Sequence, residues 1–122
     1  MCAIENTVTL TKKVTIAPSK AITRDSFVQK LKEIASNLLA FLKENGCKKL
    51  GHLKFIVTTD GEDYLQLGTS DMEKEVVAEG VLKSSFAKVR FTLNIIEFGV
   101  PREEINSKVD QEIRNMEEYF SI

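Results

Sequence analysis

Residues 51–68 read GHLKFIVTTDGEDYLQLG, and this stretch decides the fold. Apolar residues occupy every second position from Leu53 to Val57, which is the period-2 pattern of a strand with one buried face. Asp60 and Gly61 follow, and they predict a tight hairpin turn, because glycine tolerates the positive φ angle that such turns need. The alternation then resumes after the turn. We therefore expect an antiparallel hairpin around which the rest of the chain packs.

The chain before this hairpin predicts a strand and a long helix. Over residues 8–16 apolar side chains alternate with threonines, and Lys12 interrupts the apolar face, which indicates an edge strand or a bulge. The helix begins near Thr23, whose hydroxyl can accept a hydrogen bond from the first turn, and it ends at Gly46. Its apolar stripe consists of Phe27, Leu31, Ile34, Ala35, Leu38, Phe41 and Leu42. We expect burial of this stripe to be the largest single contribution to folding.

The chain after the hairpin predicts another strand and a second helix. Residues 88–99 alternate apolar with polar positions, and Pro101 suits the first helical position, where an amide would be unpaired anyway. One side of that helix carries Ile105, Val109, Ile113, Met116 and Phe120. The segment in between allows two interpretations: Ser70 and Glu73 could cap a short helix, whereas the β-prone residues that follow favour a short strand at residues 75–79. We favour the strand.

These elements predict an α+β fold of one domain over residues 1–122. Their order is strand, helix, hairpin, short strand, long strand and helix, and a chain of 122 residues has room for one hydrophobic core. Two helices can cover one face of a mainly antiparallel sheet of four to five strands. We therefore expect a two-layer sandwich in which the other sheet face carries the outward residues.

Composition excludes several classes of function. The net charge is −1, with 17 basic and 18 acidic residues, so no overall field favours nucleic acid or an anionic membrane. The N-terminus lacks the pattern of a secretory signal, and no apolar run approaches the ~18 residues that span a bilayer. Cys2 and Cys47 are too few for a disulfide framework. We expect a cytoplasmic protein with free thiols that binds neither nucleic acid nor a membrane.

Motifs for metal or catalytic chemistry are incomplete. Cys47 and His52 lie five positions apart without the further ligands that a zinc site needs, so we expect a buried thiol and an imidazole on a strand face. Asp60, Glu62 and Asp63 do not follow the EF-hand spacing, which favours a solvated hairpin tip. The glycines form no phosphate-binding motif, and the acidic residues are expected at turns and on polar helix faces. We predict no bound metal, no cofactor and no catalytic residue.

The outward sheet face is the remaining candidate site. Its candidate binding residues are His52, Lys54, Tyr64, Gln66, Arg90 and Asn94, accompanied by Thr9, Thr11 and Thr92. Tyr64 and Arg90 are the expected anchors, because these residue types are enriched at interaction hot spots. The alternative is a polar face that is merely solvated, as antiparallel sheets often have. Single-stranded RNA binding would need two or three aromatic side chains, and this face offers only Tyr64.

Three segments together resemble a known family. Residues 51–54 after a long helix, Asp60 and Gly61 a few positions on, and residues 89–94 before a last helix are similar to the C-terminal region of CobW-type proteins. Those proteins are P-loop GTPases linked to metal and corrinoid delivery. The resemblance extends from about Thr23 onward, but this chain has no GTPase domain, no Walker A loop and no Cys-x-Cys-Cys motif. It implies an accessory domain that docks on another component, and it implies neither nucleotide hydrolysis nor metal transfer.

We therefore predict a non-catalytic binding or interaction domain, which the resemblance associates with a metal- or corrinoid-related GTPase system. Its partner would be another protein or a second copy of the chain. The alternative is a small-molecule- or metal-binding protein, or an enzyme, that uses the same sheet face. Shape distinguishes the two, because a ligand site needs a concave pocket whereas a docking site can be flat.

Overall fold

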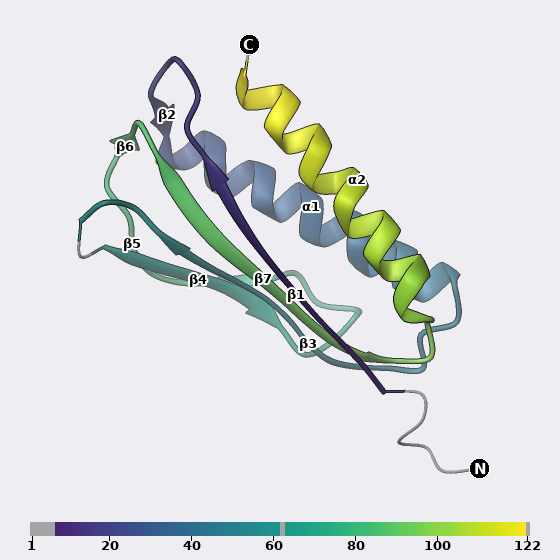
Figure 1. The fold of residues 1–122 in the computed structure, drawn as a ribbon. Helices are drawn as coiled ribbons and strands as arrows, with labels where there is room; N and C mark the ends of the chain where they lie inside the picture. The colour runs from purple at the N-terminus through teal and green to yellow at the C-terminus, as the bar shows by residue number, and fades with distance from the viewer. Residues whose placement is uncertain (1–6, 62, 122) are drawn as a thin grey trace.

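The structure is a computed structural model that describes residues 7–61 and 63–121. Its elements are β1 (Thr7–Ile16), β2 (Ile22–Thr23), α1 (Arg24–Glu44), β3 (Lys49–Thr58), β4 (Tyr64–Thr69), β5 (Val77–Val81), β6 (Ser85–Phe86), β7 (Val89–Phe98) and α2 (Arg102–Ser121). Five strands form one sheet in the order β1-β7-β3-β4-β5, and all neighbours are antiparallel. Both helices cover the same face of this sheet (Figure 1). The predicted α+β sandwich is confirmed.

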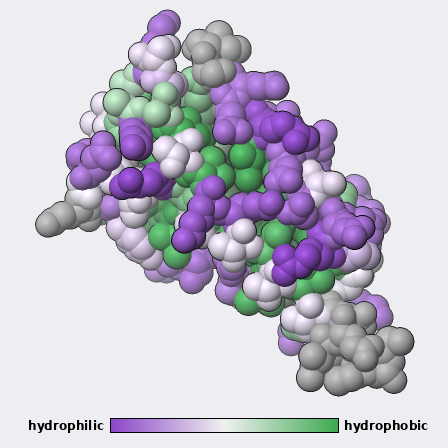
Figure 2. Space-filling view, in the orientation of Figure 1, coloured by the Kyte–Doolittle hydropathy of each residue, from purple (hydrophilic) through white to green (hydrophobic). Residues whose placement is uncertain are grey.

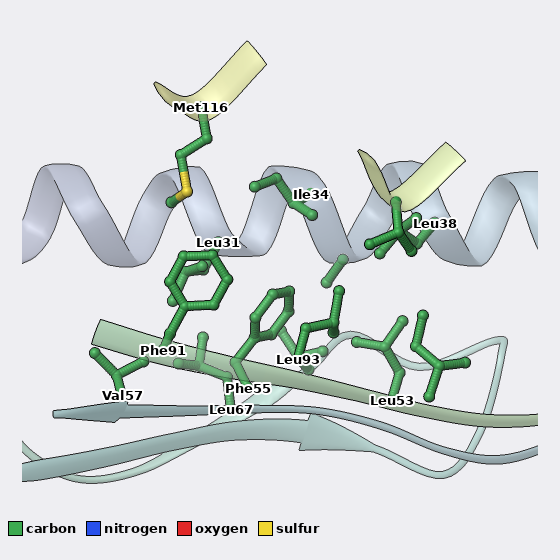
Figure 3. Packing of buried hydrophobic residues seen from close by; sticks show 14 of the residues in the cluster. Leu31, Ile34, Leu38, Leu53, Phe55, Val57, Leu67, Phe91, Leu93 and Met116 are labelled. Carbon is green, nitrogen blue, oxygen red and sulfur yellow. The ribbon is translucent and has the colours of Figure 1, made fainter. Parts of the chain in front are cut away.

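The core fills the space between the helices and the inner face of the sheet. The side chains labelled in Figure 3 come from both layers: Leu31, Ile34, Leu38 and Met116 from the helices, and Leu53, Phe55, Val57, Leu67, Phe91 and Leu93 from the sheet. Phe27 of α1 lies at one end of this core, with its ring centroid 5.7 Å from that of Phe86 and 5.9 Å from that of Phe120. The predicted stripe of α1 is thus buried, except that Phe41 is only partly buried and Leu39 joins it.

Helix α1 begins and ends where the sequence predicts. The Thr23 hydroxyl accepts a hydrogen bond from the Ser26 amide at 3.2 Å, which satisfies one of the free amides of the first turn. The last helical residue is Glu44, and Gly46 has a φ angle of +91°, the left-handed conformation that terminates helices at low cost.

Helix α2 begins one residue later than predicted, at Arg102 directly after Pro101. Ile105, Val109 and Met116 are buried on its inner side, as the spacing predicts. Figure 2 shows hydrophilic side chains over this helix and hydrophobic ones in the band between the helix and the sheet. No helix in the described residues is both long and apolar enough to span a bilayer.

The connection between β3 and β4 differs from the predicted tight turn. It runs from Thr59 to Asp63, and Gly61 does not have a positive φ angle. The buried Thr59 hydroxyl donates a hydrogen bond to the Asp63 carboxylate, whose second oxygen accepts the Lys83 amide at 3.1 Å. These two bonds lower the pKa of Asp63. Asp63 therefore ties the connection to the segment after β5 instead of being merely solvated, while Glu62 lies outside the described residues.

The segment after the hairpin forms the favoured strand at a shifted position. Strand β5 begins two residues later than the expected residues 75–79. The alternative short helix is absent, because the Asp71 carboxylate accepts the Glu73 amide at 2.8 Å within a turn. The small pair of β2 and β6 was not predicted, since two residues per strand are too few to show a period.

The two edges of the sheet are treated differently. Strand β1 is an edge strand, as the interruption at Lys12 predicts, and this side chain lies 3.2 Å from the Asp110 carboxylate of α2. Arg102 of α2 donates a hydrogen bond to the Thr9 carbonyl of β1. Strand β5 is the opposite edge, and all five of its residues are exposed.

Candidate functional site on the open sheet face

The face of the sheet opposite the helices is called the open face here. Alternation and register place the following side chains on it: Thr7, Thr9, Thr11, Lys13 and Thr15 of β1; Arg90, Thr92, Asn94, Ile96 and Phe98 of β7; Lys49, His52, Lys54, Ile56 and Thr58 of β3; Tyr64, Gln66 and Gly68 of β4; and Val77, Glu79 and Val81 of β5. The candidates predicted from sequence all lie in this set: His52, Lys54, Tyr64, Gln66, Arg90 and Asn94. The structure therefore brings them onto one surface.

The polar candidates are held mainly by one another. The imidazole Nε2 of His52 is hydrogen-bonded to Asn94 Oδ1, and Asn94 Nδ2 donates to Thr11 Oγ1 at 2.7 Å. The Tyr64 hydroxyl donates to Gln66 Oε1 at 2.6 Å. The first two bonds link neighbouring strands, and the third links two residues of β4. They fix side-chain orientation, which suits a flat recognition surface better than a catalytic centre.

The predicted anchors are separated from each other. Arg90 on β7 and Tyr64 on β4 both pair with Thr58 of β3, so they lie two strands apart, about 10 Å at ~4.8 Å per strand. Arg90 is exposed and makes no ion pair with another described residue. The two side chains can therefore contact different parts of one partner.

The open face also carries an apolar patch, of which sequence reasoning had named only Tyr64. Ile56 is 37% exposed, Tyr64 45%, Val77 65% and Val81 73%, and these are four of the five large apolar side chains that the described residues expose. The fifth, Tyr119, lies on α2. The alternation indicates that Ile56 points outward, but Val77 and Val81 could be placed only once the position and register of β5 were known.

The charge of the open face differs from that of the whole chain. It carries the basic residues Lys13, Lys49, Lys54 and Arg90 and one carboxylate, Glu79. The chain as a whole has a net charge of −1. The open face is therefore locally basic as well as apolar.

One hollow on the open face is lined by three of the candidates, His52, Lys54 and Gln66. It has a volume of about 190 Å³ and lies above Gly68, between Lys54 and Glu79. This is below the ~300–1,000 Å³ of typical small-molecule sites. Larger hollows of about 640 and 470 Å³ lie on the other side of the sheet, between α1 and the segment 72–82. Among the described residues, no three His, Cys, Asp or Glu side chains are grouped closely enough to hold a metal ion.

Two buried carboxylates, those of Glu97 and Glu112, contradict the prediction that acidic residues lie at turns and on polar helix faces. Glu97 of β7 is fully buried, and its Oε1 accepts the Val100 amide at 2.9 Å, while Oε2 has no partner among the described residues. Burial raises the pKa of Glu97. The nearby Cys47 is only partly buried, not buried as expected, and its thiol donates to the Lys49 carbonyl at 3.4 Å.

The Cys47 thiol is not activated for chemistry. Burial raises its pKa, and the neighbouring Glu97 carboxyl adds to this shift. Because the thiolate is the nucleophile and the metal ligand, a raised pKa makes both roles unfavourable. The imidazole of His52 is engaged with Asn94 on the open face, so the two residues that sequence spacing suggested as a pair do not form one site.

Comparisons with known proteins give distant similarity. No protein-family model matches the sequence, and no curated protein gives a significant match. Among solved structures, the chain is similar to a Zn(II)-bound triple mutant of the YjiA GTPase, with 19% identity and a TM-score of 0.46, and to the Zn(II)-bound YjiA GTPase from E. coli, with 17% identity and a TM-score of 0.45. Both matches cover 84% of this chain and 29% of the YjiA chain.

YjiA is a GTPase of the CobW family, the family that the sequence resembles. The chain spans less than a third of the YjiA chains that it matches.

Proposed function

We propose that the protein is a non-catalytic docking domain that binds an acidic surface of a protein partner on its open face. The observation that carries this proposal is the apolar patch around Ile56, Tyr64 and Val81 on a face that no helix covers. Exposed apolar patches rimmed by polar side chains are typical of interaction sites. The basic residues Lys54 and Arg90 beside the patch favour a partner whose surface carries carboxylates.

A protein surface fits the open face better than a single-stranded nucleic acid does. Stacking of successive bases needs aromatic side chains close together. Tyr64 lies level with Arg90, whereas the partly buried Phe98 lies further along β7, about 27 Å away at ~3.4 Å per residue. A small molecule is also less well supported, since the hollow on this face is small and open.

Site-specific photocrosslinking tests the proposal. Benzophenone-bearing amino acids are placed at Ile56 on the open face and, as a control, at the exposed Glu44 at the end of α1. The sequence resemblance makes a CobW-type GTPase from the same organism the first purified partner to test, followed by whole extract. We expect a crosslinked product from position 56 that is absent from position 44 and decreases with added salt.

Substitutions test the same surface independently. We expect Arg90→Ala and Tyr64→Ala to reduce the crosslinked yield while unfolding free energies stay within about 0.5–1 kcal/mol of wild type. Arg114→Ala on the exposed side of α2 is the matched control and should leave the yield unchanged. Equal yields for all folded variants would show that the open face is merely solvated. A crosslink between two copies of the chain would replace the heterologous partner with self-association.

A further inference from the structure

Strand β5 leaves both of its faces uncovered. Val77 and Val81 are exposed on the open face, and Ala78 and Gly80 are exposed on the side of the helices. Two helices packed ~10 Å apart cover about 20 Å of sheet, whereas five strands at ~4.8 Å extend further. The inner side chains of β4, Leu65 and Leu67, are still buried, whereas all residues of β5 are exposed, so only the strand at this far edge receives no cover from the helices seen in Figure 1.

A groove runs beside this edge on the side of the helices. One part, of about 470 Å³, lies between Val28 of α1 and Ala78, Gly80 and Leu82. A second part, of about 640 Å³, continues along α1, and both parts are lined by Lys32. We call these two hollows the α1–β5 groove. The part beside β5 has mixed walls: Val28, Leu65, Ala78 and Leu82 supply apolar surface, and Arg24, Asp25 and Lys32 supply charged groups.

The backbone of β5 is equally accessible. Among the described strands it pairs only with β4, in an uninterrupted register, so its outward amide and carbonyl groups have no strand partner. Proteins usually protect such edges with proline, charged side chains, bulges or a covering element. Strand β5 contains neither proline nor lysine; its one charged residue is Glu79, and Gly80 has a φ angle of +105° within a regular register. The other edge is instead covered through Arg102 and Lys12.

Charge decides which strand fits this edge. Glu79 lies at the centre of β5 and makes no ion pair with another described residue. Two copies paired antiparallel about this centre would place Glu79 opposite Glu79, and like charges directly opposite each other are destabilising. A basic side chain opposite Glu79 would instead be favourable.

We propose that β5 accepts an extended segment of a partner protein as a sixth strand of the sheet. Because side chains alternate between faces, a lysine or arginine opposite Glu79 would place its two neighbours in the α1–β5 groove. Because Val28, Leu65, Ala78 and Leu82 form the apolar part of this groove, we expect the recognised segment to have a basic residue between two apolar residues. This β-augmentation takes affinity from backbone hydrogen bonds and specificity from alternate side chains. It uses the edge, the groove and Glu79, so it does not depend on partner binding to the patch around Ile56 and Tyr64.

A displayed library of random twelve-residue peptides, selected on the folded protein, provides the probe. We expect the selected peptides to share an apolar-basic-apolar pattern and to slow amide hydrogen exchange within Val77–Val81. N-methylation of alternate peptide amides removes backbone donors without changing side chains. In an added strand, every second amide faces β5 and the others face solvent. N-methylation of the amides that face β5 should weaken binding at least about tenfold, and N-methylation of the others should leave binding nearly unchanged.

Charge reversal supplies the matched comparison. Glu79→Lys should weaken the basic peptides about tenfold and restore binding to versions in which the basic residue is replaced by glutamate. Glu44→Lys makes the same change of charge at an exposed position away from β5 and should have no effect. Selection that yields no peptide protecting β5 from exchange, or peptides insensitive to both N-methylation and Glu79→Lys, would overturn the proposal. Loss of open-face crosslinking alone would leave it standing, since that experiment reports on Ile56.

Discussion

Two buried glutamates are accommodated in different ways. Glu112 of α2 accepts a hydrogen bond from Asn37 at 2.9 Å and lies 3.4 Å from the Lys108 ammonium, so both of its oxygens have partners. Glu97 of β7 accepts the Val100 amide through Oε1, and among the described residues no hydrogen bond reaches its Oε2. A buried carboxylate without a counter-charge is more stable when protonated, which is the physical reason for its raised pKa.

Glu97 should therefore make stability depend on pH. A folded-state pKa above the unfolded value gives a contribution that is complete below the unfolded pKa and is lost as the pH rises through the folded pKa. We expect Glu97→Gln, which keeps an acceptor for the Val100 amide, to be more stable than wild type at neutral pH and to lose this part of the dependence. Urea unfolding between mild acid and neutral pH measures it, with the exposed Glu44→Gln as control. A Glu97→Gln profile parallel to that of wild type would contradict the assignment.

The start of α1 depends on one hydroxyl. Thr23 accepts the Ser26 amide, so Thr23→Ala should lower the free energy of unfolding by about 1 kcal/mol, within the range of ~0.5–2 for lost N-caps. Thr23→Ser keeps the acceptor and should retain most of the wild-type free energy of unfolding. Denaturant unfolding of the three proteins is the measurement. If the serine variant is as unstable as the alanine variant, the loss comes from the methyl group of threonine and not from the cap.

The inner side of α1 is the most heavily buried surface of any helix here. Leu38 is fully buried between the helix and the sheet (Figure 3), so Leu38→Ala should destabilise the fold by roughly 2–5 kcal/mol. Ser36→Ala on the exposed side of the same helix is the control and should change stability by less than about 0.5 kcal/mol. A similar small loss for Leu38→Ala would mean that the stripe of α1 is not the core.

Elements with a sustained period were predictable, and those set by distant contacts were not. The two long helices and β3 and β7 show their period over many residues, so their position followed from sequence alone. The connection after β3 depends on Asp63 meeting the Lys83 amide, which no local pattern reveals. Strand β5 is shifted because its register is fixed by β4.

The candidate site was predictable in its polar part only. Alternation placed Arg90 and Asn94 on the open face correctly. The exposed apolar residues Val77 and Val81 were not predicted there. The buried position of Glu97 was also readable, because the alternation of β7 continues to it from Ile95. Charged side chains are rarely buried, so residue type predicted an exposed Glu97 although its position in the alternation predicted a buried one. The structure shows that the position in the strand prevails.

The part of the chain that the structure describes offers no group of ligands for resident zinc. Cys47 directs its thiol to the Lys49 carbonyl, and His52 is engaged with Asn94 on the open face. We therefore expect the purified protein to contain much less than one zinc ion per chain by elemental analysis. One bound metal per chain that survives dialysis would contradict this and would require ligands beyond these two residues.

The order of strands in the sheet determines when each strand can pair during translation. Strand β7 pairs with both β1 and β3, yet it is the last strand of the chain to be translated (Figure 1). The meander of β3, β4 and β5 can assemble as soon as it emerges, because its pairings are local. Strand β1 is made first and has no neighbour until β7 leaves the exit tunnel, so its apolar side stays available to chaperones for most of translation.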